Sequence, residues 1–510
     1  MTESAEAGNV ELELKLALPR DRHGAVGELP MFRDTPSQQL HEVTTYYDTP
    51  DFDLRREGTA LRIRKRGDRL IQTLKTRGGD EVASNRGEWE WDVGSDVPDL
   101  GRLGETPRAE LAQQLDGRLR PVFRTDIART VHMLDGAGGA RIEAALDRGQ
   151  IIAGDASEPV SELELELKSG SDPAALYHMA LDIHARVPLA LAGESKAARG
   201  YRLLDGREPT ARKAPKIRLA PDITVADGFR RITGSALSHL VANARLAERG
   251  DPEGIHQVRV ALRRLRAALL LFKRHLDRAE CKYFGDALRK LGRVLGAARD
   301  WDVFVLETMA DARGEHRDES WPGELDAAAS ALRLQAHRDA AVALEGPGLT
   351  NMVLSLAAWV EDGVRDPSLL GSKTVRKDLC QIAPKMLDRV DKKARQLGAN
   401  IEALEEEELH ALRKALKKLR YDAEFLEGLY PHDAVKEYRK HCEYLQEILG
   451  RFNDARVTID LAGKLGKRHG DGLTGAVDAA RAWSEARRDS VLGQLGPAWQ
   501  DFQAASPFWA

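Results

Sequence analysis

Apolar and charged residues alternate along roughly the first 200 positions of the chain. The segment VELELKLAL shows this period of two, and it recurs in ALRIRKR, GEWEWDV, ARIEAALD and SELELELKSG. Such alternation is typical of β-strands whose two faces meet different surroundings. We therefore predict that residues from about 8 to about 205 form mainly strands, with a helix over 172–187.

The second part of the chain follows a different pattern. From about residue 222 onward, apolar residues recur at spacings of three and four, which predicts helices. The segment between the two parts, REPTARKAPKIRLAP, holds three prolines and no periodic core pattern, so it is predicted to be a linker. The predicted organisation is a strand-rich domain over 1–206, a linker over 207–221 and a helical domain over 222–510.

The helical part contains an internal repeat. HQVRVALRRLR begins at His256 and HALRKALKKLR begins at His410, an offset of 410 − 256 = 154 residues. LGRVLGAARDWDV begins at Leu291 and LQEILGRFNDARV at Leu445, and 445 − 291 is again 154. Two motifs that share one gapless offset indicate two copies of one helical unit, related by a pseudo-twofold axis. The predicted copies span about 222–365 and about 373–510.

Charged residues share strand faces in the first part. Because side chains i, i+2 and i+4 of a strand point the same way, Glu11, Glu13 and Lys15 lie on one face. Similar rows are Arg62, Arg64 and Arg66; Glu88, Glu90 and Asp92; Glu143 and Asp147; and Glu162, Glu164, Glu166 and Lys168. Each row alone could be the solvated face of a half-buried sheet. Rows of both signs favour a closed or curved sheet with a polar interior.

Such an interior suits a polyanion together with a divalent metal. Paired carboxylates supply the hard oxygen ligands that Mg²⁺ and Mn²⁺ prefer. Arg and Lys bind phosphate oxygens, and Arg can do so with two hydrogen bonds. Fixed cations and a metal would neutralise a phosphoanhydride so that water can attack it.

The first part resembles the CYTH superfamily of triphosphate tunnel enzymes. Its ExExK signature is Glu11-Leu12-Glu13-Leu14-Lys15. The segments that match in order after it are TTYYDTP, ALRIRKR, QTLKT, RGEWEWDV, FRTDIAR, IEAALDRGQI, ELELELKSG and SKAARGYRLL. The set most resembles the bacterial inorganic triphosphatases. The resemblance implies an α+β chain in which an antiparallel β-barrel tunnel with flanking helices precedes the all-α part.

The resemblance also implies roles for the charged residues. The ligands of Mg²⁺ or Mn²⁺ are expected to be Glu11, Glu13, Asp147, Glu162, Glu164 and Glu166. The triphosphate is expected to contact Lys15, Arg62, Arg64, Lys75, Arg129 and Lys196. The catalytic groups are expected to be Glu162, Glu164 and Lys15. Arg199 and Tyr201 could equally be structural.

Each copy of the helical repeat carries a basic stripe. His256, Arg259, Arg263 and Arg266 share one helix face, because they fall at i, i+3, i+7 and i+10. The second copy repeats the spacing with His410, Arg413, Lys417 and Arg420. Like charges on one stripe repel each other, so the repeated stripe predicts an anion-binding surface. Each histidine could donate to phosphate or pack at a helix start, and Asp251-Pro252 predicts such a start.

From about Asp222 to the C-terminus the chain resembles the CHAD domain, a conserved histidine α-helical domain. The resemblance rests on the two basic helices and on the paired segments GAARDWDV and GRFNDARV. It implies two four-helix bundles with a basic groove that binds inorganic polyphosphate. Asp300 and Asp454 occupy equivalent places and are expected to bond the basic helices. Lys417 replaces the Arg of the first copy, which a polyphosphate chain should tolerate.

The composition limits the other functional classes. The chain has 510 residues, 31% of them charged, but a net charge of only −4, so it is not a basic nucleic-acid-binding protein as a whole. A basic stripe by itself does not distinguish polyphosphate from a nucleic-acid backbone. Its three cysteines are far apart, and we find neither a secretory signal nor 18 consecutive apolar residues. We expect a cytoplasmic protein without membrane association, docked to polyphosphate granules; its oligomeric state stays open.

The function predicted from these features is metal-dependent hydrolysis of tripolyphosphate to diphosphate and phosphate, with a helical module that binds longer polyphosphate. One alternative is a non-catalytic protein that binds polyphosphate through both parts. Others keep the tunnel but change its substrate to thiamine triphosphate, a nucleoside triphosphate, or ATP in an adenylate cyclase. Trp89 and Trp91 alternate with the acidic row, so we predict that they pack in a core rather than stack on a base.

Overall fold

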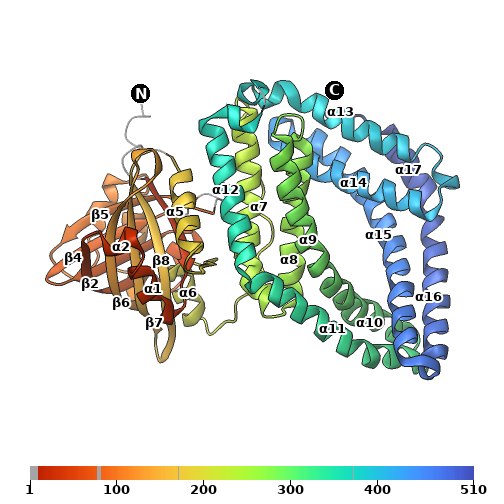
Figure 1. Cartoon of the computed structure of the whole chain (residues 1–510), viewed down its shortest axis with the longest axis horizontal. Coiled ribbons are helices and arrows are strands. Elements are labelled where there is room, and N and C mark those ends of the chain that lie inside the picture. The colour runs from red at the N-terminus through yellow and green to blue at the C-terminus, as the bar shows by residue number, and fades with distance from the viewer. Residues whose placement is uncertain (1–9, 77, 79–81, 171, 372, 510) are drawn as a thin grey trace. The chain divides into compact units, whose positions relative to one another are not determined.

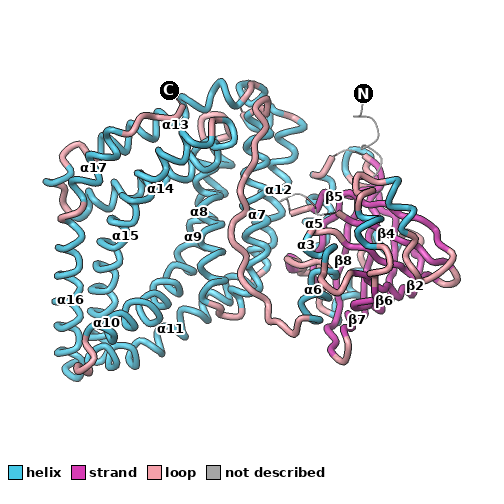
Figure 2. Tube along the Cα trace, turned by 180° about the vertical axis from the view of Figure 1, so that it is seen from behind, coloured by secondary structure: helices cyan, strands magenta, loops and turns pink. Residues whose placement is uncertain are grey.

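The structure is a computed structural model that describes residues 10–76, 78, 82–170, 172–371 and 373–509. The chain divides into two compact units. The first consists of Met1–Arg212, Leu237–Leu246 and Glu345–Arg365, and the second of Lys213–Ala236, Ala247–Leu344 and Asp366–Ala510. Within the described ranges, all nine strands belong to the first unit, and the second unit is built from helices (Figure 2).

Eight antiparallel strands close into a barrel (Figure 1). Their order is β5-β4-β3-β2-β6-β7-β8-β1, and β1 pairs with β5 to complete the closure, while the short β9 adds to β1. The strands are β1 Val10–Ala17, β2 Ser37–Asp48, β3 Ala60–Arg66, β4 Arg69–Lys75, β5 Ser84–Val93, β6 Arg120–Asp135, β7 Arg141–Ala153, β8 Ala156–Ser169 and β9 Ala190–Leu191. The predicted antiparallel barrel, followed by an all-helical part, is therefore confirmed.

The period of two along the strands separates an apolar outer face from a charged inner face. Leu14 and Leu16 on β1 and Leu163 and Leu165 on β8 are fully buried outside the barrel wall. Helix α5 (Ala174–His184) packs against these two strands and covers that face. Removing this apolar surface from water stabilises the closed sheet, and the alternating charged residues are left to point inward.

The two tryptophans of β5 belong to the outer apolar face. Trp89 and Trp91 pack against a cluster of buried leucines from neighbouring strands and short helices. The cluster is Leu54, Leu61, Leu74, Leu103, Leu111 and Leu115. The prediction that these tryptophans serve packing is confirmed. The short helices of this part are α1 His23–Gly27, α2 Pro30–Arg33, α3 Asp53–Arg56 and α4 Leu111–Leu115.

Helix α6 (Lys196–Leu204) contacts β6, β7 and β8 and is held in place by several features. Ser195 caps it by accepting a hydrogen bond from the amide of Ala198, and a Cβ on Gly200 would lie only 2.2 Å from the Phe123 ring. The Tyr201 hydroxyl donates to Oδ2 of the buried Asp48 at 2.7 Å. Tyr201 thus anchors the helix that carries Lys196 at its first position.

The helices of the second part follow the offset of the repeated motifs. Helices α8 (Pro252–Phe272) and α14 (Glu406–Leu426) begin and end 154 residues apart. The unbroken α15 (His432–His469) corresponds to α9 (Arg278–Asp302), a π-helical turn over Val303–Thr308 and α10 (Met309–Glu315). The other helices are α7 Val225–Glu248, α11 Trp321–Glu345, α12 Pro347–Arg365, α13 Leu379–Leu397, α16 Thr474–Leu492 and α17 Leu495–Ala504.

Two backbone hydrogen bonds join the copies symmetrically. The amide of Val225 donates to the carbonyl of Lys377 at 2.9 Å, and the amide of Leu379 donates to the carbonyl of Ile223 at 2.8 Å. Because 225 + 154 = 379 and 223 + 154 = 377, each bond becomes the other when the copies are exchanged. A local pseudo-twofold axis therefore passes between the starts of α7 and α13.

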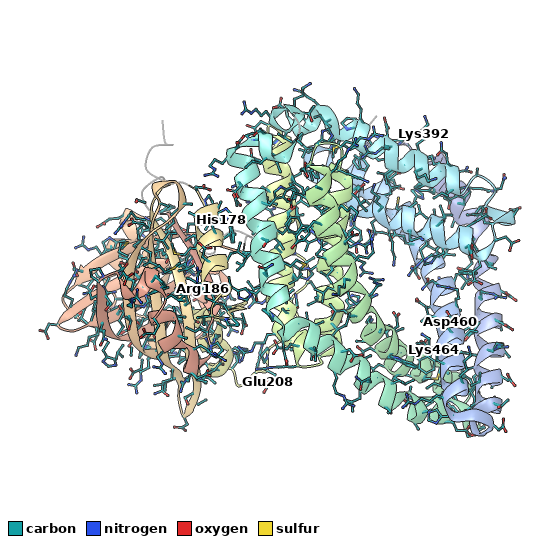
Figure 3. All side chains as sticks on the ribbon, viewed as in Figure 1. His178, Arg186, Glu208, Lys392, Asp460 and Lys464 are labelled. Carbon is teal, nitrogen blue, oxygen red and sulfur yellow. The ribbon has the colours of Figure 1, made fainter. Side chains whose placement is uncertain are left out.

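Helix α12 lies with α5 in the first unit. The His178 Nε2 atom is 2.8 Å from Asp362 Oδ2, and the His184 Nε2 atom is 3.0 Å from the Pro347 carbonyl (His178 is labelled in Figure 3). No single helix in the described part of the chain is both long and apolar enough to cross a membrane. Only α11 and α12 taken together, across a bend, meet that criterion.

Candidate functional site

The barrel encloses a cavity lined mainly by charged side chains. Its acidic residues are Glu11, Glu13, Glu42, Glu88, Glu90, Glu143, Asp147, Glu164 and Glu166. Its basic residues are Lys15, Arg62, Arg64, Arg66, Lys75, Arg86, Arg129, Lys168 and Lys196. The acidic and basic residues are equal in number, so the barrel interior carries no large net charge.

Strand register brings these opposite charges together. Residue Arg129 on β6 lies opposite Asp147 on β7, which lies opposite Glu162 on β8. On the other side of β8, Glu164 lies opposite Lys15 on β1. Directly opposed side chains of an antiparallel pair are close enough to interact, so three neighbouring strand pairs converge on one place.

Asp147, Glu162 and Glu164 form a buried group that we name the three-carboxylate cluster. Their carboxyl oxygens lie within 4.8 Å of one another, and the three residues are 0%, 3% and 7% exposed. Among the residues that the structure describes, these are the three side chains whose ligand atoms lie close enough together to share one metal ion. Three hard oxygen donors at this spacing have the chemistry of a site for a divalent cation.

Three cations neutralise the cluster in the structure. Lys196 Nζ lies 2.7 Å from Asp147 Oδ2 and 2.8 Å from Glu164 Oε1, and it also pairs with Glu162. Arg129 Nη2 lies 2.6 Å from both Asp147 Oδ2 and Glu164 Oε2, and Lys15 pairs with Glu164. Each carboxylate of the cluster therefore has at least one cationic partner.

These partners shift the pKa values of the cluster. Burial alone would raise the pKa of Glu164, but Lys15, Lys196 and Arg129 outweigh it and hold this pKa well below its ordinary value. The pKa of Asp147 is lowered in the same way, because Lys196 and Arg129 outweigh the effect of burial. Burial raises the pKa of Glu162, and the attraction of Lys196 only partly offsets it.

The other three predicted metal ligands lie outside this cluster. Glu11 pairs with Lys75 at 2.8 Å and with Arg86 at 2.9 Å, both to its Oε2. Glu13 pairs with Lys15 at 2.5 Å and with Arg86 at 2.8 Å. These carboxylates line the same cavity, but cations hold them apart from the three-carboxylate cluster.

Glu166 has partners that differ from those of Glu11 and Glu13. Its Oε1 accepts a hydrogen bond from Lys168 Nζ at 2.7 Å, and it lies opposite Glu143 and Glu13 in the sheet. Burial raises the pKa of Glu166 to about 7, although Lys168 opposes the shift.

Three of the six predicted phosphate-binding cations, Arg62, Arg64 and Lys75, lie together on the wall formed by β3 and β4. Arg62 Nη2 lies 3.5 Å from Glu88 Oε1, and Arg64 Nε lies 3.7 Å from Glu42 Oε2, both longer than close ion pairs. The Nε atoms of Arg62 and Arg64 are buried without a hydrogen-bond partner. Burial and the repulsion of Arg62 lower the pKa values of both Arg64 and Lys75. Under-bonded cations of this kind can donate to an anion that enters the cavity.

Two cavity residues were missed in the sequence analysis. Arg86 lies two and four positions before Glu88 and Glu90, so the period of two could have placed it on the inner face. Glu42 stands on a face shared with Thr44 and Tyr46, and no charged row drew attention to it. It accepts hydrogen bonds from Arg66 Nε at 2.8 Å and Arg66 Nη2 at 2.5 Å.

The basic stripes of the helical repeat lie on α8 and α14, which contact each other. The predicted helix start is confirmed, because Asp251 caps α8 and Pro252 is its first residue. The charges of Arg263 from the first copy and Arg413 from the second both act on Lys417. Together with burial, they lower the pKa of Lys417 to about 7. The centres of the two stripes therefore converge.

Asp300 on α9 and Asp454 on α15 lie near these centres. Burial raises the pKa of Asp300, while Arg259 of its own copy and Arg413 of the other attract it, as does Lys464 on α15 (labelled in Figure 3). Within the described ranges, no carboxylate forms an ion pair with Arg259, Arg263, Arg413 or Lys417. The Nε atoms of Arg263, Arg413 and Arg420 are buried without a hydrogen-bond partner. Unlike the barrel, this surface carries excess positive charge.

The ends of the two stripes are His256 and Arg266 on α8 and His410 and Arg420 on α14. Burial lowers the pKa values of His256 and His410, with neighbouring basic groups adding to the effect. Without an anion, both imidazoles are therefore mainly neutral near pH 7. Arg266 lies near Arg289, and Arg420 stacks over the Tyr421 ring at 4.8 Å.

Comparison with known proteins agrees with this architecture. Residues 9–201 match the CYTH domain family, and residues 231–463 match the CHAD domain family. The inorganic triphosphatase of Haemophilus influenzae is 35% identical over 199 residues, which are 38% of this chain and 54% of that protein. This chain thus spans about half the length of that relative.

Two further relatives cover the helical part. An uncharacterized protein of Mycobacterium tuberculosis is 28% identical over 453 residues, which are 83% of this chain and 82% of that protein. The crystal structure of the CHAD domain from the plant Ricinus communis matches with a TM-score of 0.52 and 28% identity. It covers 59% of this chain and 98% of that domain.

Proposed function

Since the chain consists of a CYTH domain followed by a CHAD domain, we propose that its barrel hydrolyses inorganic triphosphate to diphosphate and phosphate with Mg²⁺ or Mn²⁺. The observation that carries this proposal is the cavity itself. It brings Asp147 and Glu164 of the three-carboxylate cluster into one cavity with the under-bonded Arg62 and Arg64. The similarity of the barrel sequence to an inorganic triphosphatase supports the same substrate.

The three-carboxylate cluster fits a divalent metal. Its donors are oxygen atoms, it is buried, and its ligand atoms are close enough to share one ion. Hard donors of this kind suit Mg²⁺ and Mn²⁺ better than softer metals. When bound, such an ion would neutralise phosphate charge and activate or position a water molecule. Glu11, Glu13 and Glu166 line the same cavity and could contribute to the metal site through water.

The cations of the cavity would hold the triphosphate. Lys15, Arg62, Arg64, Lys75, Arg129 and Lys196 are assigned to this role. In the free protein many of them pair with carboxylates, so binding would exchange internal ion pairs for contacts with phosphate oxygens. Donors fixed before the reaction stabilise developing charge without further reorganisation. Lys15 and Arg129 would stabilise charge near the metal site, and Glu162 and Glu164 would orient the attacking water.

The helical part would bind inorganic polyphosphate at the converging stripes of α8 and α14. A long polyanion needs several unpaired cations, and Arg259, Arg263, Arg413 and Lys417 provide them without carboxylate partners. His256, Arg266, His410 and Arg420 would extend the contact along each stripe. From the repeated helices we further infer that each copy forms a four-helix bundle.

A substrate panel tests the proposed reaction. Phosphate release is measured for the full chain with tripolyphosphate, thiamine triphosphate and ATP, each with Mg²⁺, Mn²⁺ or a chelator. The full chain is used because Glu345–Arg365 packs in the same unit as the barrel. We expect tripolyphosphate to be the best substrate and the chelator to stop its hydrolysis. If ATP or thiamine triphosphate is hydrolysed faster than tripolyphosphate, the proposed substrate is wrong. If none of them releases phosphate, the protein binds polyphosphate without hydrolysing a triphosphate.

A further inference from the structure

Lys196 has an unusual position, because its ammonium group lies among all three members of the three-carboxylate cluster. Nζ is 2.7 Å from Asp147 Oδ2 and 2.8 Å from Glu164 Oε1, and it pairs with Glu162 Oε1. Among the described residues, these are the same three side chains whose oxygen atoms are close enough to share a metal ion. The ammonium therefore occupies the place where a cation would gain most from the cluster.

The position of Lys196 affects the charge balance of the three-carboxylate cluster. Three carboxylates face three cations, because Lys15 and Arg129 join Lys196. Lys196 contacts all three carboxylates, so it supplies one of the three positive charges that balance the cluster in the structure.

A divalent metal and this ammonium cannot share the cluster. A divalent metal held by the same carboxylates would lie close to Nζ, and the two positive charges would repel each other. If the ammonium stayed, a dication would also leave a large excess of positive charge in a buried site. The metal must therefore displace Lys196 from the carboxylates.

Lys196 differs from Arg129 and Lys15 in how its cationic group is held. Arg129 is fixed by a bidentate pair with Asp147 and a further bond to Glu164. Lys15 is also tied to Glu13 by a 2.5 Å contact. Lys196 is the first residue of α6, whose backbone is held by the Ser195 cap, while its flexible stem reaches into the cavity.

Further polar groups of the cavity lie close enough to feel the Lys196 charge. This charge acts on Tyr46, as do the charges of Arg62 and Lys75. Arg62 and Lys75 line the same cavity as Lys196, on the wall formed by β3 and β4. A triphosphate on that wall would offer the ammonium new oxygen partners and make its departure from the cluster favourable.

We propose that Lys196 is a built-in counter-ion of the metal site, which holds the three-carboxylate cluster in the free protein and transfers to the triphosphate when the metal binds. This inference rests on the proposed function, because it takes the cluster as the metal site. The metal and the triphosphate then bind cooperatively, since each favours the same position of Lys196. Such coupling is reciprocal: the factor by which triphosphate tightens metal binding equals the factor by which metal tightens triphosphate binding.

Binding of Mn²⁺ to the full chain, followed by electron paramagnetic resonance without any phosphate compound, tests the inference. Wild-type protein is expected to bind Mn²⁺ weakly, and Lys196→Met is expected to bind it at least about tenfold more tightly, because the competing charge is gone. Arg66→Met is the matched control. It removes one cation from the same cavity, but Arg66 pairs with Glu42 rather than with the cluster. An equal gain in Arg66→Met, or no gain in Lys196→Met, overturns the inference.

A second measurement uses only the wild-type protein, so it tests the counter-ion role even if Lys196→Met does not fold. The affinity of wild-type protein for Mn²⁺ is measured at buffered free Mn²⁺ with and without diimidotriphosphate, whose two bridging nitrogens resist hydrolysis. We expect the analogue to raise Mn²⁺ affinity about tenfold or more, and Mn²⁺ to raise affinity for the analogue by the same factor. Independent binding of the two would overturn the inference.

The outcomes also separate this inference from the proposed reaction. If tripolyphosphate is not hydrolysed but the Mn²⁺ affinity depends on Lys196 as described, the proposed reaction is wrong and the counter-ion role stands. If tripolyphosphate is hydrolysed but wild-type and Lys196→Met proteins bind Mn²⁺ equally well, the reaction stands and the counter-ion role is wrong.

Discussion

Arg129 and Asp147 form a bidentate ion pair across β6 and β7, with Nε 2.7 Å from Oδ1 and Nη2 2.6 Å from Oδ2. The same Nη2 atom donates to Oε2 of Glu164 at 2.6 Å. One guanidinium thus holds two members of the three-carboxylate cluster in place. It links the stability of the barrel to the geometry of the proposed metal site.

We predict that Arg129→Ala lowers the free energy of unfolding by about 3 kcal/mol. Removing Arg129 leaves the buried carboxylates of Asp147 and Glu164 with fewer cationic partners, which destabilises the folded state. Arg141→Ala is the control, because its pair with Asp135 is largely exposed and should contribute less than about 1 kcal/mol. Denaturant unfolding measures both variants. A loss for Arg129→Ala no greater than that of Arg141→Ala would show that the pair does not stabilise the barrel.

Asp422 on α14 gives a prediction about stability and pH. It is fully buried, neither carboxyl oxygen has a hydrogen-bond partner, and burial raises its pKa to about 7 despite Lys418 and Arg389. Between about pH 4 and pH 7 the native state keeps a proton that the unfolded state loses. The wild-type protein therefore loses stability as the pH rises through this range.

The substitution Asp422→Ala should remove that loss of stability. The first copy already has an alanine at the equivalent position, because the residue 154 positions earlier is the buried Ala268. Relative to wild type, the variant should gain about 4 kcal/mol of unfolding free energy between pH 4 and pH 8. Asp460→Ala, an exposed position on α15 labelled in Figure 3, is the control and should show no such trend. A gain that shrinks as the pH rises would contradict the prediction.

Much of this architecture follows from the sequence pattern. The period of two placed Glu11, Glu13, Lys15, Glu162 and Glu164 on inner faces, because strand geometry fixes alternate directions whatever the partner strand. The offset of 154 residues extends from the motifs to the bounds of α8 and α14. Both results depend on local geometry, which is encoded in neighbouring residues.

The grouping of the charges was less predictable, because it depends on the register between strands that are distant in sequence. Asp147 meets Glu162 through the β7–β8 pairing, whereas Glu11 meets Arg86 through the closure of β1 onto β5. A shift of register by one residue would change every such contact. The sequence therefore predicted most of the charged side chains that enter the cavity, but not Arg86 and Glu42, and not that Lys196 would lie among the three carboxylates.

The double variant Arg259→Ala with Arg413→Ala tests the separation of the two activities. It removes one unpaired cation from each copy, so polyphosphate affinity should fall by about tenfold or more and depend less steeply on salt. Tripolyphosphate turnover should stay within about twofold of wild type. Binding and turnover are measured at one ionic strength, and an equal loss of both would contradict two separate modules.

Lys417 should make polyphosphate binding depend on pH. Its pKa is about 7 in the free protein, because burial and the charges of Arg413 and Arg263 disfavour the ammonium form. A bound polyanion would raise this pKa, so binding takes up a proton and weakens as the pH rises above about 7. Between pH 7 and pH 9, the affinity for long-chain polyphosphate should fall by about tenfold at constant ionic strength.

Lys417→Arg is the matched variant for this effect. An arginine stays protonated throughout the range and restores the residue type that Arg263 provides in the first copy. Its affinity should change by less than about threefold between pH 7 and pH 9. The same pH dependence in both proteins would show that Lys417 is not the group that titrates.

The most direct test of the proposed reaction compares phosphate release from tripolyphosphate by wild-type protein and by Glu164→Gln, with Mg²⁺ and Mn²⁺. Glu164 belongs to the three-carboxylate cluster and bonds Lys15, Lys196 and Arg129, and the substitution removes its charge with little change in shape. Glu105→Gln, at an exposed position, is the control. We expect metal-dependent release by wild type and Glu105→Gln and at least about a hundredfold loss in Glu164→Gln. Release by Glu164→Gln at the wild-type rate, or release by wild type that persists in a chelator, would contradict metal-dependent hydrolysis in the barrel.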